Sequence, residues 1–292
     1  MQELAVIITA EDAGKAVRQI ALQTMQMSFA QFKRAKFQGA LVLDGEAVHA
    51  DRRVRAGQTL IIRVPDASAA PVAPSLRKLI VVYEDDDLLI VDKPAPLPSV
   101  GSPRQGGETL ENAVCAYLGA PEGFIYRPVN RLDKGTSGLM AVAKHAHAQQ
   151  YLQRRLHSDD FIREYLAVCD GIPRAEQGVI DAPIQKADGA SIRRVVSADG
   201  RPARTQYRVE QTGNGRSLIR LRLFTGRTHQ IRVHLQSIGC PVTGDFLYGT
   251  EHPLLARRFA LHSAALELDT LQKKHIRLQS TPPDVWMQLF ID

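Results

Sequence analysis

The sequence predicts an α+β fold in two units, a small N-terminal domain over residues 1–65 and a larger domain over residues 79–292, joined by a linker over residues 66–78. Hydrophobic residues make up 44% of the chain and charged residues 23%, as in an ordinary folded protein. Apolar residues recur with helical spacing in some segments and with strand spacing in others, without the regular alternation of a doubly wound parallel sheet. The stretch "PDASAAPVAPS" mixes Pro, Ala and Ser without periodicity, which is typical of a linker.

The N-terminal domain is predicted to contain two helices, a hairpin and a strand. The segment "AGKAVRQIALQTM" carries apolar residues every three to four positions, which gives a helix one apolar face. A second helix, "SFAQFKRAKFQG", is expected to begin at the N-cap Ser28 and to end before Gly39. Asp44-Gly45 indicates a hairpin turn, and residues 60–64 alternate as in a strand.

Basic residues of this domain cluster on the second helix and after the hairpin. The residues expected to contact RNA are Lys33, Arg34, Lys36, Arg52 and Arg53. A net charge of +6 for the whole chain fits an anionic partner such as nucleic acid. With its two helices, "LVLDGEAVHADRRVRAGQTL" and a closing strand, the domain resembles the small RNA-binding domain first known from ribosomal protein S-four. The resemblance implies phosphate contacts that are largely independent of sequence; the alternative is a solvated helix face.

The larger domain alternates irregularly between strand and helix patterns. "LIVVYEDDDLLIVDKP" predicts two short strands around an acidic turn, "GLMAVAKH" a buried strand and "FIREYLAVCDG" another strand. In "SLIRLRLFTG", Leu221 is expected to face the core while Arg220 and Arg222 face outward. Helices are predicted for "TLENAVCAYLG", with Tyr117 on its apolar face, for "AHAQQYLQRRLHS" and for "THQIRVHLQSIG", which Gly239 ends.

Several classes of function lose their usual signatures. The sequence contains no GxGxxG, GxxxxGK[ST], GxSxG or HExxH motif, and its three cysteines form no CxxC pair. We therefore expect no cofactor and no metal site, and expect His234 and His262 to be hydrogen-bonded core residues. No stretch approaches the roughly 18 apolar residues of a membrane span, and the first residues lack the pattern of a signal peptide. A cytoplasmic location is the resulting expectation.

Four polar segments carry the candidate chemistry. They are "RLDKGTSGL" with Asp133, "DKPA" with Lys93, "REYLAVCDG" with Tyr165, and "TGRTHQIRVHLQSIGCPVTGDFLYG". Together they resemble the RluA-type branch of the pseudouridine synthases over nearly all of residues 79–290. Asn130 stands where that family usually has histidine, which puts the contacts around the substrate nucleotide in question.

The resemblance implies a core with a mixed, mostly antiparallel sheet and flanking helices, in which Asp133 acts as nucleophile or base. Arg227 is expected to pair with Asp133, since burial without a cation would disfavour the carboxylate's charge. Tyr165 is expected to stack on the flipped uracil. The residues predicted to bind the substrate nucleotide are Arg131, Lys93, Thr136, His229, Gln230 and Arg232. Arg193 and Arg194 are predicted to contact RNA phosphates.

The predicted function is isomerisation of uridine to pseudouridine in structured RNA by a monomeric enzyme. Large-subunit ribosomal RNA is the favoured substrate, because the small RNA-binding domain accompanies such enzymes in the family, and transfer RNA remains open. One alternative is a non-catalytic RNA-binding protein that helps ribosome assembly. A second is a hydrolase that uses Asp133 with a histidine, although the chain has no nucleophile motif to support it.

Overall fold

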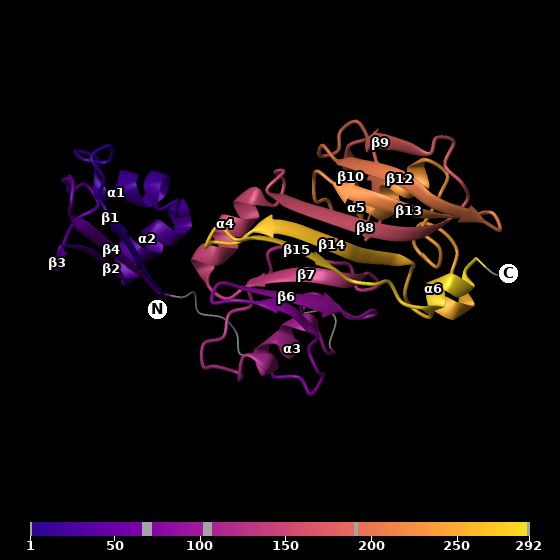
Figure 1. Ribbon diagram of the computed structural model, residues 1–292, viewed down its shortest axis with the longest axis horizontal. Helices are drawn as coiled ribbons and strands as arrows, with labels where there is room; N and C mark the ends of the chain where they lie inside the picture. Colours follow the sequence, from indigo (N-terminus) through magenta and orange to yellow (C-terminus); the bar gives the residue numbers. More distant parts are fainter. Residues whose placement is uncertain (1, 66–71, 102–106, 190–191, 291–292) are drawn as a thin grey trace.

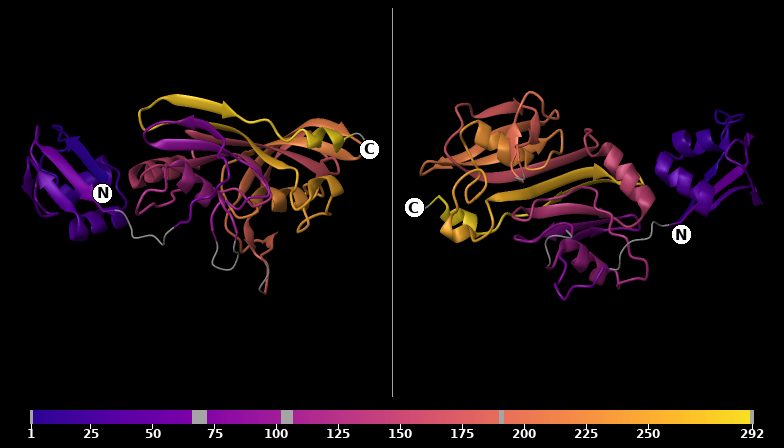
Figure 2. Two further views of the ribbon diagram at one scale, coloured as in Figure 1. Left: turned by 90° about the horizontal axis from the view of Figure 1, so that it is seen from below. Right: turned by 180° about the vertical axis from the view of Figure 1, so that it is seen from behind.

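A computed structural model describes residues 2–65, 72–101, 107–189 and 192–290 of the chain. Residues 66–71 of the predicted linker lie outside the described residues. Figure 1 shows the N-terminal elements gathered at one end of the molecule, beyond the end of a long twisted sheet, and Figure 2 shows the same arrangement from two further directions. Within the described residues, no helix combines the length and the apolar character needed to cross a membrane.

The N-terminal elements form an antiparallel sheet in the order β1-β4-β2-β3, covered by helices and with a hydrophobic core of its own. In chain order they are β1 (Gln2–Ile7), α1 (Val17–Gln19), the π-helix η1 (Ile20–Thr24), α2 (Phe29–Gln38), β2 (Ala40–Leu43), β3 (Glu46–Ala47) and β4 (Thr59–Val64).

Local sequence signals explain these elements. The Ser28 hydroxyl accepts a hydrogen bond from the Gln31 backbone N–H at 3.1 Å, and Gln31 Oε1 accepts one from the Ser28 N–H at 3.0 Å, which confirms the predicted N-cap as a capping box. Asp44 and Gly45 both adopt positive φ, 51° and 87°, as the turn of a two-residue hairpin requires. The buried side of β4 alternates as expected, with Leu60 exposed by 0%.

The remaining elements build a larger unit. Its strands are β5 (Val81–Glu84), β6 (Leu88–Lys93), β7 (Ser137–Ala143), β8 (Phe161–Asp170), β9 (Gln177–Asp181), β10 (Ile184–Lys186), β11 (Arg194–Val196), β12 (Arg204–Gly213), β13 (Arg216–Leu223), β14 (Leu261–Asp269) and β15 (His275–Gln279). Its helices are α3 (Leu110–Tyr117), α4 (Ala146–Arg155), α5 (Gln230–Ser237), the 3₁₀-helix η2 (Pro253–Leu255) and α6 (Val285–Gln288).

Within the described residues, nine of these strands form one sheet in the order β5-β6-β7-β14-β8-β13-β12-β9, with β15 paired to β14. The pair β7–β14 is parallel and the other pairs are antiparallel. The predicted α+β class with a mixed, mostly antiparallel sheet is therefore confirmed. At the parallel pair, Gly138 has a φ of 102°, and a Cβ there would lie 2.3 Å from the Ser263 carbonyl oxygen. Only glycine permits this approach of β7 to β14.

One helix face differs from the prediction. Leu110, Ala113 and Val114 of α3 are buried as expected, but Tyr117 is 46% exposed. Its hydroxyl donates to Glu84 on β5 at 2.6 Å, so this aromatic residue ends at the rim of the core with its polar group satisfied.

Gln150 on α4 of the larger unit makes hydrogen bonds to the N-terminal unit. Its Oε1 accepts a hydrogen bond from the Ser28 N–H at 2.7 Å, and its Nε2 donates to the Gln26 carbonyl. The N-terminal elements therefore lie against α4, as Figure 1 also shows.

Candidate active site

The loop between α3 and β7 presents Asp133 and is held by backbone and side-chain hydrogen bonds. The Leu97 N–H donates to the Lys134 carbonyl at 3.0 Å, and the Ser99 hydroxyl donates to the Leu132 carbonyl at 2.7 Å. A turn inside the loop is closed by the Thr136 N–H, which donates to the Asp133 carbonyl at 3.0 Å. The segment after β6 therefore supports the loop and fixes the position of the Asp133 carboxylate.

Arg232 on α5 forms the ion pair with Asp133. Its Nη1 donates to Asp133 Oδ2 at 3.0 Å, and the Arg232 and Asp133 side chains are 4% and 29% exposed. The predicted pairing of Asp133 with Arg227 is wrong in this structure, because Arg227 Nε donates to the Pro202 carbonyl at 2.9 Å. Arg227 does line the same small cavity as Asp133. The guanidinium that pairs with Asp133 therefore belongs to Arg232 in the first turn of α5, and not to Arg227 in the loop before the helix.

Asp245 and two aromatic rings lock the Arg232 side chain. Arg232 Nε and Nη2 donate to the two oxygens of Asp245, which is 0% exposed, at 2.6 and 2.7 Å. The guanidinium also lies 4.3 Å from the ring centre of Phe259 and 5.0 Å from that of Tyr248. Burial alone lowers the pKa of Arg232, but the two carboxylates raise it overall. Arg232 therefore stays charged and holds its Nη1 toward Asp133.

The Phe259 ring also supports the loop that carries Asp133. A Cβ at Gly135 would lie 2.6 Å from Cε1 of Phe259, so the loop backbone rests directly on the ring. One aromatic side chain thus contacts both the loop of the carboxylate and the guanidinium that pairs with it.

Tyr165 lies in the middle of β8, opposite Leu221 on one neighbouring strand and Ser263 on the other. It is 5% exposed and lines the cavity with Asp133. Burial raises the pKa of the Tyr165 phenol, with a smaller contribution from the charge of Asp133. The phenol is therefore protonated at neutral pH, and its ring forms part of the cavity floor.

Two more predicted residues come from the turn that starts α5. His229 adopts a left-handed conformation with φ 58°, and its Nε2 lies 3.9 Å from Asp133 Oδ2. Burial lowers the pKa of His229, and its Nδ1 shares a hydrogen bond of 2.9 Å with the Tyr248 hydroxyl. Gln230 is 3% exposed, and its amide bonds to Thr225, Thr205 and backbone groups of the turn. Gln230 therefore shapes the turn; it also lines the cavity of Asp133, and its contact with substrate stays a prediction.

The remaining wall residues differ in exposure. Arg131 is exposed at the mouth of the cavity, whereas Thr136 is 2% exposed in its wall. Asn130 is buried, and its Oδ1 accepts a hydrogen bond from the Ala141 N–H of β7 at 3.0 Å. The asparagine that replaces the family's usual histidine thus anchors the start of the loop to the sheet.

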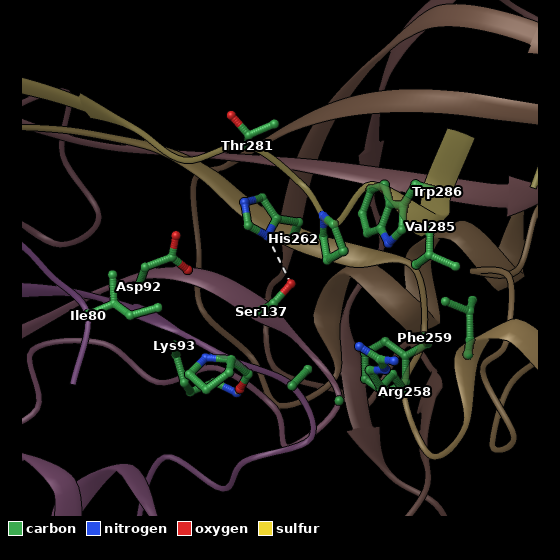
Figure 3. Close-up of a pocket in the computed structure, with 15 residues that line it drawn as sticks. Ile80, Asp92, Lys93, Ser137, Arg258, Phe259, His262, Thr281, Val285 and Trp286 are labelled. Carbon is green, nitrogen blue, oxygen red and sulfur yellow. Dashed lines mark hydrogen bonds between the residues drawn. The ribbon is translucent and has the colours of Figure 1, made fainter. Parts of the chain in front are cut away.

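Lys93 lies at the end of β6, in the wall of a second cavity that borders the same loop at Gly135. Figure 3 shows Lys93 and Ser137 among the residues that line this cavity, with Ser137 hydrogen-bonded to His262. Lys93 is 0% exposed, and its Nζ donates to the carbonyl oxygens of Leu97 and Pro94 at 2.8 and 3.1 Å. The prediction that Lys93 binds substrate does not fit this burial. Its contacts instead brace the segment that supports the Asp133 loop.

Burial lowers the pKa of Lys93 from 10.5 to about 7, although the charges of Asp133 and Asp92 oppose the shift. Between these two pH values, the folded chain binds fewer protons at Lys93 than the unfolded chain does. The free-energy cost of burying Lys93 therefore decreases as pH rises, and the free energy of unfolding increases. Between about pH 7 and about pH 9, we expect the unfolding free energy of wild type to rise by about 2 kcal/mol relative to that of Lys93→Met. Urea unfolding of both proteins at both pH values measures this. An unchanged difference would show that Lys93 keeps its ordinary pKa.

The two histidines expected in the core are hydrogen-bonded there. His234 Nδ1 lies 2.8 Å from the Thr205 hydroxyl, and its Nε2 lies 2.9 Å from the Ala182 carbonyl oxygen. Besides the bond to Ser137, His262 Nε2 contacts the Ser280 hydroxyl at 3.1 Å. No group of three or more His, Cys, Asp and Glu side chains within the described ranges is arranged to hold a metal ion.

The basic residues predicted to contact RNA fall in two places. Those of the N-terminal unit lie on or beside α2 and after the hairpin; Lys33, Lys36, Arg52 and Arg53 are exposed and Arg34 is half-buried. Arg193 and Arg194 lie at the start of β11, beside the active site. The Arg193 guanidinium is 5.6 Å from the ring centre of Tyr248, and the Arg194 N–H donates to the Tyr248 hydroxyl at 2.8 Å.

Sequence reasoning missed the roles of Asp245, Tyr248 and Phe259. The first two lie in the quoted segment "TGDFLYG", so their presence in a motif with Arg232 was the available signal. Phe259 lies in no such motif, and only the tertiary structure shows its place beneath the loop.

The chain is similar to known RNA pseudouridine synthases. The family model described as RNA pseudouridylate synthase matches residues 87–237. A ribosomal large subunit pseudouridine synthase D of Xanthomonas campestris is 35% identical over 282 residues, which cover 88% of this chain and 83% of that protein. The protein of the same name from Nitrosomonas europaea is 40% identical over 258 residues, which cover 83% of this chain and 70% of that protein. An uncharacterized RNA pseudouridine synthase of Bacillus subtilis is 36% identical over 237 residues, covering 79% and 78%.

Solved structures show the same fold. Human RNA pseudouridylate synthase domain containing 1 superposes with a TM-score of 0.59 at 24% identity, over 74% of this chain and 87% of that chain. Human RNA pseudouridylate synthase domain containing 4 superposes with a TM-score of 0.57, also at 24% identity, over 71% of this chain and 90% of that chain.

Proposed function

This chain belongs to the RNA pseudouridylate synthase family and isomerises uridine in RNA, and we propose that its substrate is large-subunit ribosomal RNA and that Asp133 is its catalytic carboxylate. Two relatives that align over most of both chains are named ribosomal large subunit pseudouridine synthases, which supports this substrate. The observation that carries the catalytic role is the pairing of Asp133 with the buried Arg232 in a cavity that Tyr165 also lines.

The reaction places clear demands on such a cavity. The bond between uracil N1 and ribose C1′ breaks, the base turns, and C5 bonds to C1′. The hydrogen on C5 leaves as a proton, and N1 takes up a proton, so that no atom is gained or lost overall. The overall change is an isomerisation, so it calls for one carboxylate near the sugar and base and for a pocket that holds the detached base. The base must first leave its stack at a cost of a few kcal/mol.

The arrangement around Asp133 fits these demands. Arg232 donates a charge-assisted hydrogen bond to the Asp133 carboxylate at 3.0 Å and fixes its orientation. The partly exposed Asp133 faces the cavity and acts as a nucleophile on the sugar or as a base. The ring of Tyr165 offers a stacking surface, which contributes roughly 1–3 kcal/mol per base and offsets much of the flipping cost.

The unit of residues 1–65 is proposed to be an RNA-binding domain that positions the substrate. Its exposed cations on α2 and after the hairpin would contact phosphates and supply salt-dependent affinity. The enzyme is proposed to act as a monomer. A ribosomal RNA substrate in turn supports a cytoplasmic location.

The substrate proposal is tested with two pools of RNA made without modification, one of large-subunit ribosomal RNA and one of transfer RNA. Pseudouridine is mapped in each pool by carbodiimide labelling and primer extension after incubation with the enzyme. We expect one or more modified uridines in the ribosomal pool. Modification confined to the transfer RNA pool would overturn the proposed substrate and leave the uridine isomerase activity in place.

A further inference from the structure

Arg163, on β8, is a buried cation for which the described structure provides no carboxylate. The residue is 3% exposed, and it lies two positions before Tyr165, so both side chains occupy the same face of the strand. Its Nη2 donates to His157 Nδ1 at 3.1 Å and to the Thr225 carbonyl at 3.5 Å. Its Nε is buried and has no hydrogen-bond partner among the described residues.

Three other buried or half-buried arginines are paired with carboxylates. Arg232 binds two carboxylates, and Arg220 and Arg222 on the adjacent β13 bind Glu210 and Asp159. Burying a guanidinium without an anion is costly, and this burial lowers the pKa of Arg163. Arginine nevertheless stays protonated in proteins. The buried charge of Arg163 therefore destabilises the folded protein, and an anion bound beside it would offset this cost.

The Arg163 guanidinium lies directly beneath Gly226. This exposed glycine has no side chain to cover the guanidinium: a Cβ there would lie 3.4 Å from Arg163 Nη1 and 3.1 Å from Cε1 of His157. His157 is exposed and accepts the Arg163 hydrogen bond at Nδ1, which leaves its Nε2–H as a donor. Burial lowers the pKa of His157, as do the nearby charges of Arg163 and Arg227, so the ring is neutral at pH 7.

Arg227 completes a cationic group beside Gly226. Its Nε bonds to the Pro202 carbonyl, and its two Nη groups make no hydrogen bond within the described part of the chain. Arg227 and Tyr165 both line the cavity of Asp133, so the group adjoins the place where the ribose would lie. The RNA substrate carries a phosphate on each side of that ribose.

We propose that Arg163, His157 and Arg227 form, around Gly226, a subsite for the RNA phosphate next to the uridine being isomerised. The inference rests on the proposed function and adds a substrate contact to it. Two guanidinium groups and one imidazole N–H match the several acceptor oxygens of a phosphate. The phosphate supplies the anion that Arg163 lacks, and it anchors the backbone on one side of the flipped nucleotide.

The test compares Arg163→Gln with Arg277→Gln, which removes the same charge from β15, where exposed Arg277 pairs with Glu267 of β14. Tritium release from C5-tritiated ribosomal RNA gives kcat and KM, and binding is followed across a series of salt concentrations. For Arg163→Gln we expect KM to rise about 10-fold and the slope of log affinity against log salt to fall by about 1. For Arg277→Gln we expect both to stay near wild type.

A second variant covers the case in which Arg163→Gln fails to fold. Gly226→Val keeps every charge and covers Arg163 Nη1, and the position has no positive φ that would strain a side chain. It is expected to raise KM by a similar factor and to reduce the salt slope. A folded Arg163→Gln or Gly226→Val enzyme with the KM and slope of Arg277→Gln would overturn the subsite. Absence of tritium release by wild type would instead reject the proposed function itself.

Discussion

Asp133→Asn is expected to abolish pseudouridine formation while the protein stays folded and binds RNA. The loss of rate should be about 10⁴-fold or more, as when an enzyme's reacting group is removed. Asparagine has the same shape and can still accept a hydrogen bond from Arg232, so the loop should keep its place. It can neither attack the sugar nor accept a proton at neutral pH. Single-turnover formation of pseudouridine, followed by nucleoside chromatography, measures the effect.

The control for this prediction is RNA affinity, which should be unchanged or slightly tighter. Phosphate contacts dominate the affinity for RNA, and the variant removes a negative charge that faces a polyanion. Because the Asp133 side chain is 29% exposed, its replacement should change stability by less than about 1 kcal/mol. A folded variant that retains more than about a tenth of the wild-type rate would exclude Asp133 as the reacting carboxylate.

Arg232→Gln carries the second largest expected effect, because it breaks two ion pairs. Asp133 loses the hydrogen bond that orients it, and kcat should fall by about 10²- to 10³-fold. Asp245, which is 0% exposed, is left as a buried unpaired carboxylate, and this should lower the free energy of unfolding by about 3–5 kcal/mol. Tritium release and urea unfolding measure the two effects separately.

A double variant separates chemistry from stability. Arg232→Gln combined with Asp245→Asn removes the orphaned charge, so stability should recover in large part while kcat stays low. The matched single variant is Arg227→Gln, which removes a guanidinium from the same segment but leaves the Asp133 ion pair intact. It should affect KM more than kcat. If Arg227→Gln lowered kcat as much as Arg232→Gln, the ion pair seen here would not be the one that serves catalysis.

Local signals explain why much of the fold was predictable. The N-cap at Ser28, the turn at Asp44-Gly45 and the alternation in β4 depend on neighbouring residues, and all three appear as expected. The order of the strands in the nine-stranded sheet, seen among the described residues, depends on long-range pairing, which periodicity does not encode. The prediction that Tyr117 is buried was wrong for the same reason, because helical spacing does not reveal where a core ends.

The sequence predicted which segments meet at the candidate site, but it did not predict which side chains contact each other there. Motif spacing brought Asp133, Tyr165 and the α5 region together correctly, since all line one cavity. It did not reveal which arginine reaches Asp133, because Arg227 and Arg232 are five residues apart and the helix orients only the second toward the loop. The alternation of β8 did contain a usable signal for Arg163, which shares the face of Tyr165.

Tritium release from large-subunit ribosomal RNA labelled at C5 of uracil, with wild type and Asp133→Asn side by side, tests directly whether Asp133 carries out the isomerisation. Formation of the new bond at C5 must expel that hydrogen, so release reports the isomerisation itself. Wild type should release tritium in proportion to the modified uridines, and Asp133→Asn should release none above background. Binding of the RNA without release by wild type would contradict the proposed ribosomal substrate, and absence of release from transfer RNA as well would favour a non-catalytic RNA-binding protein.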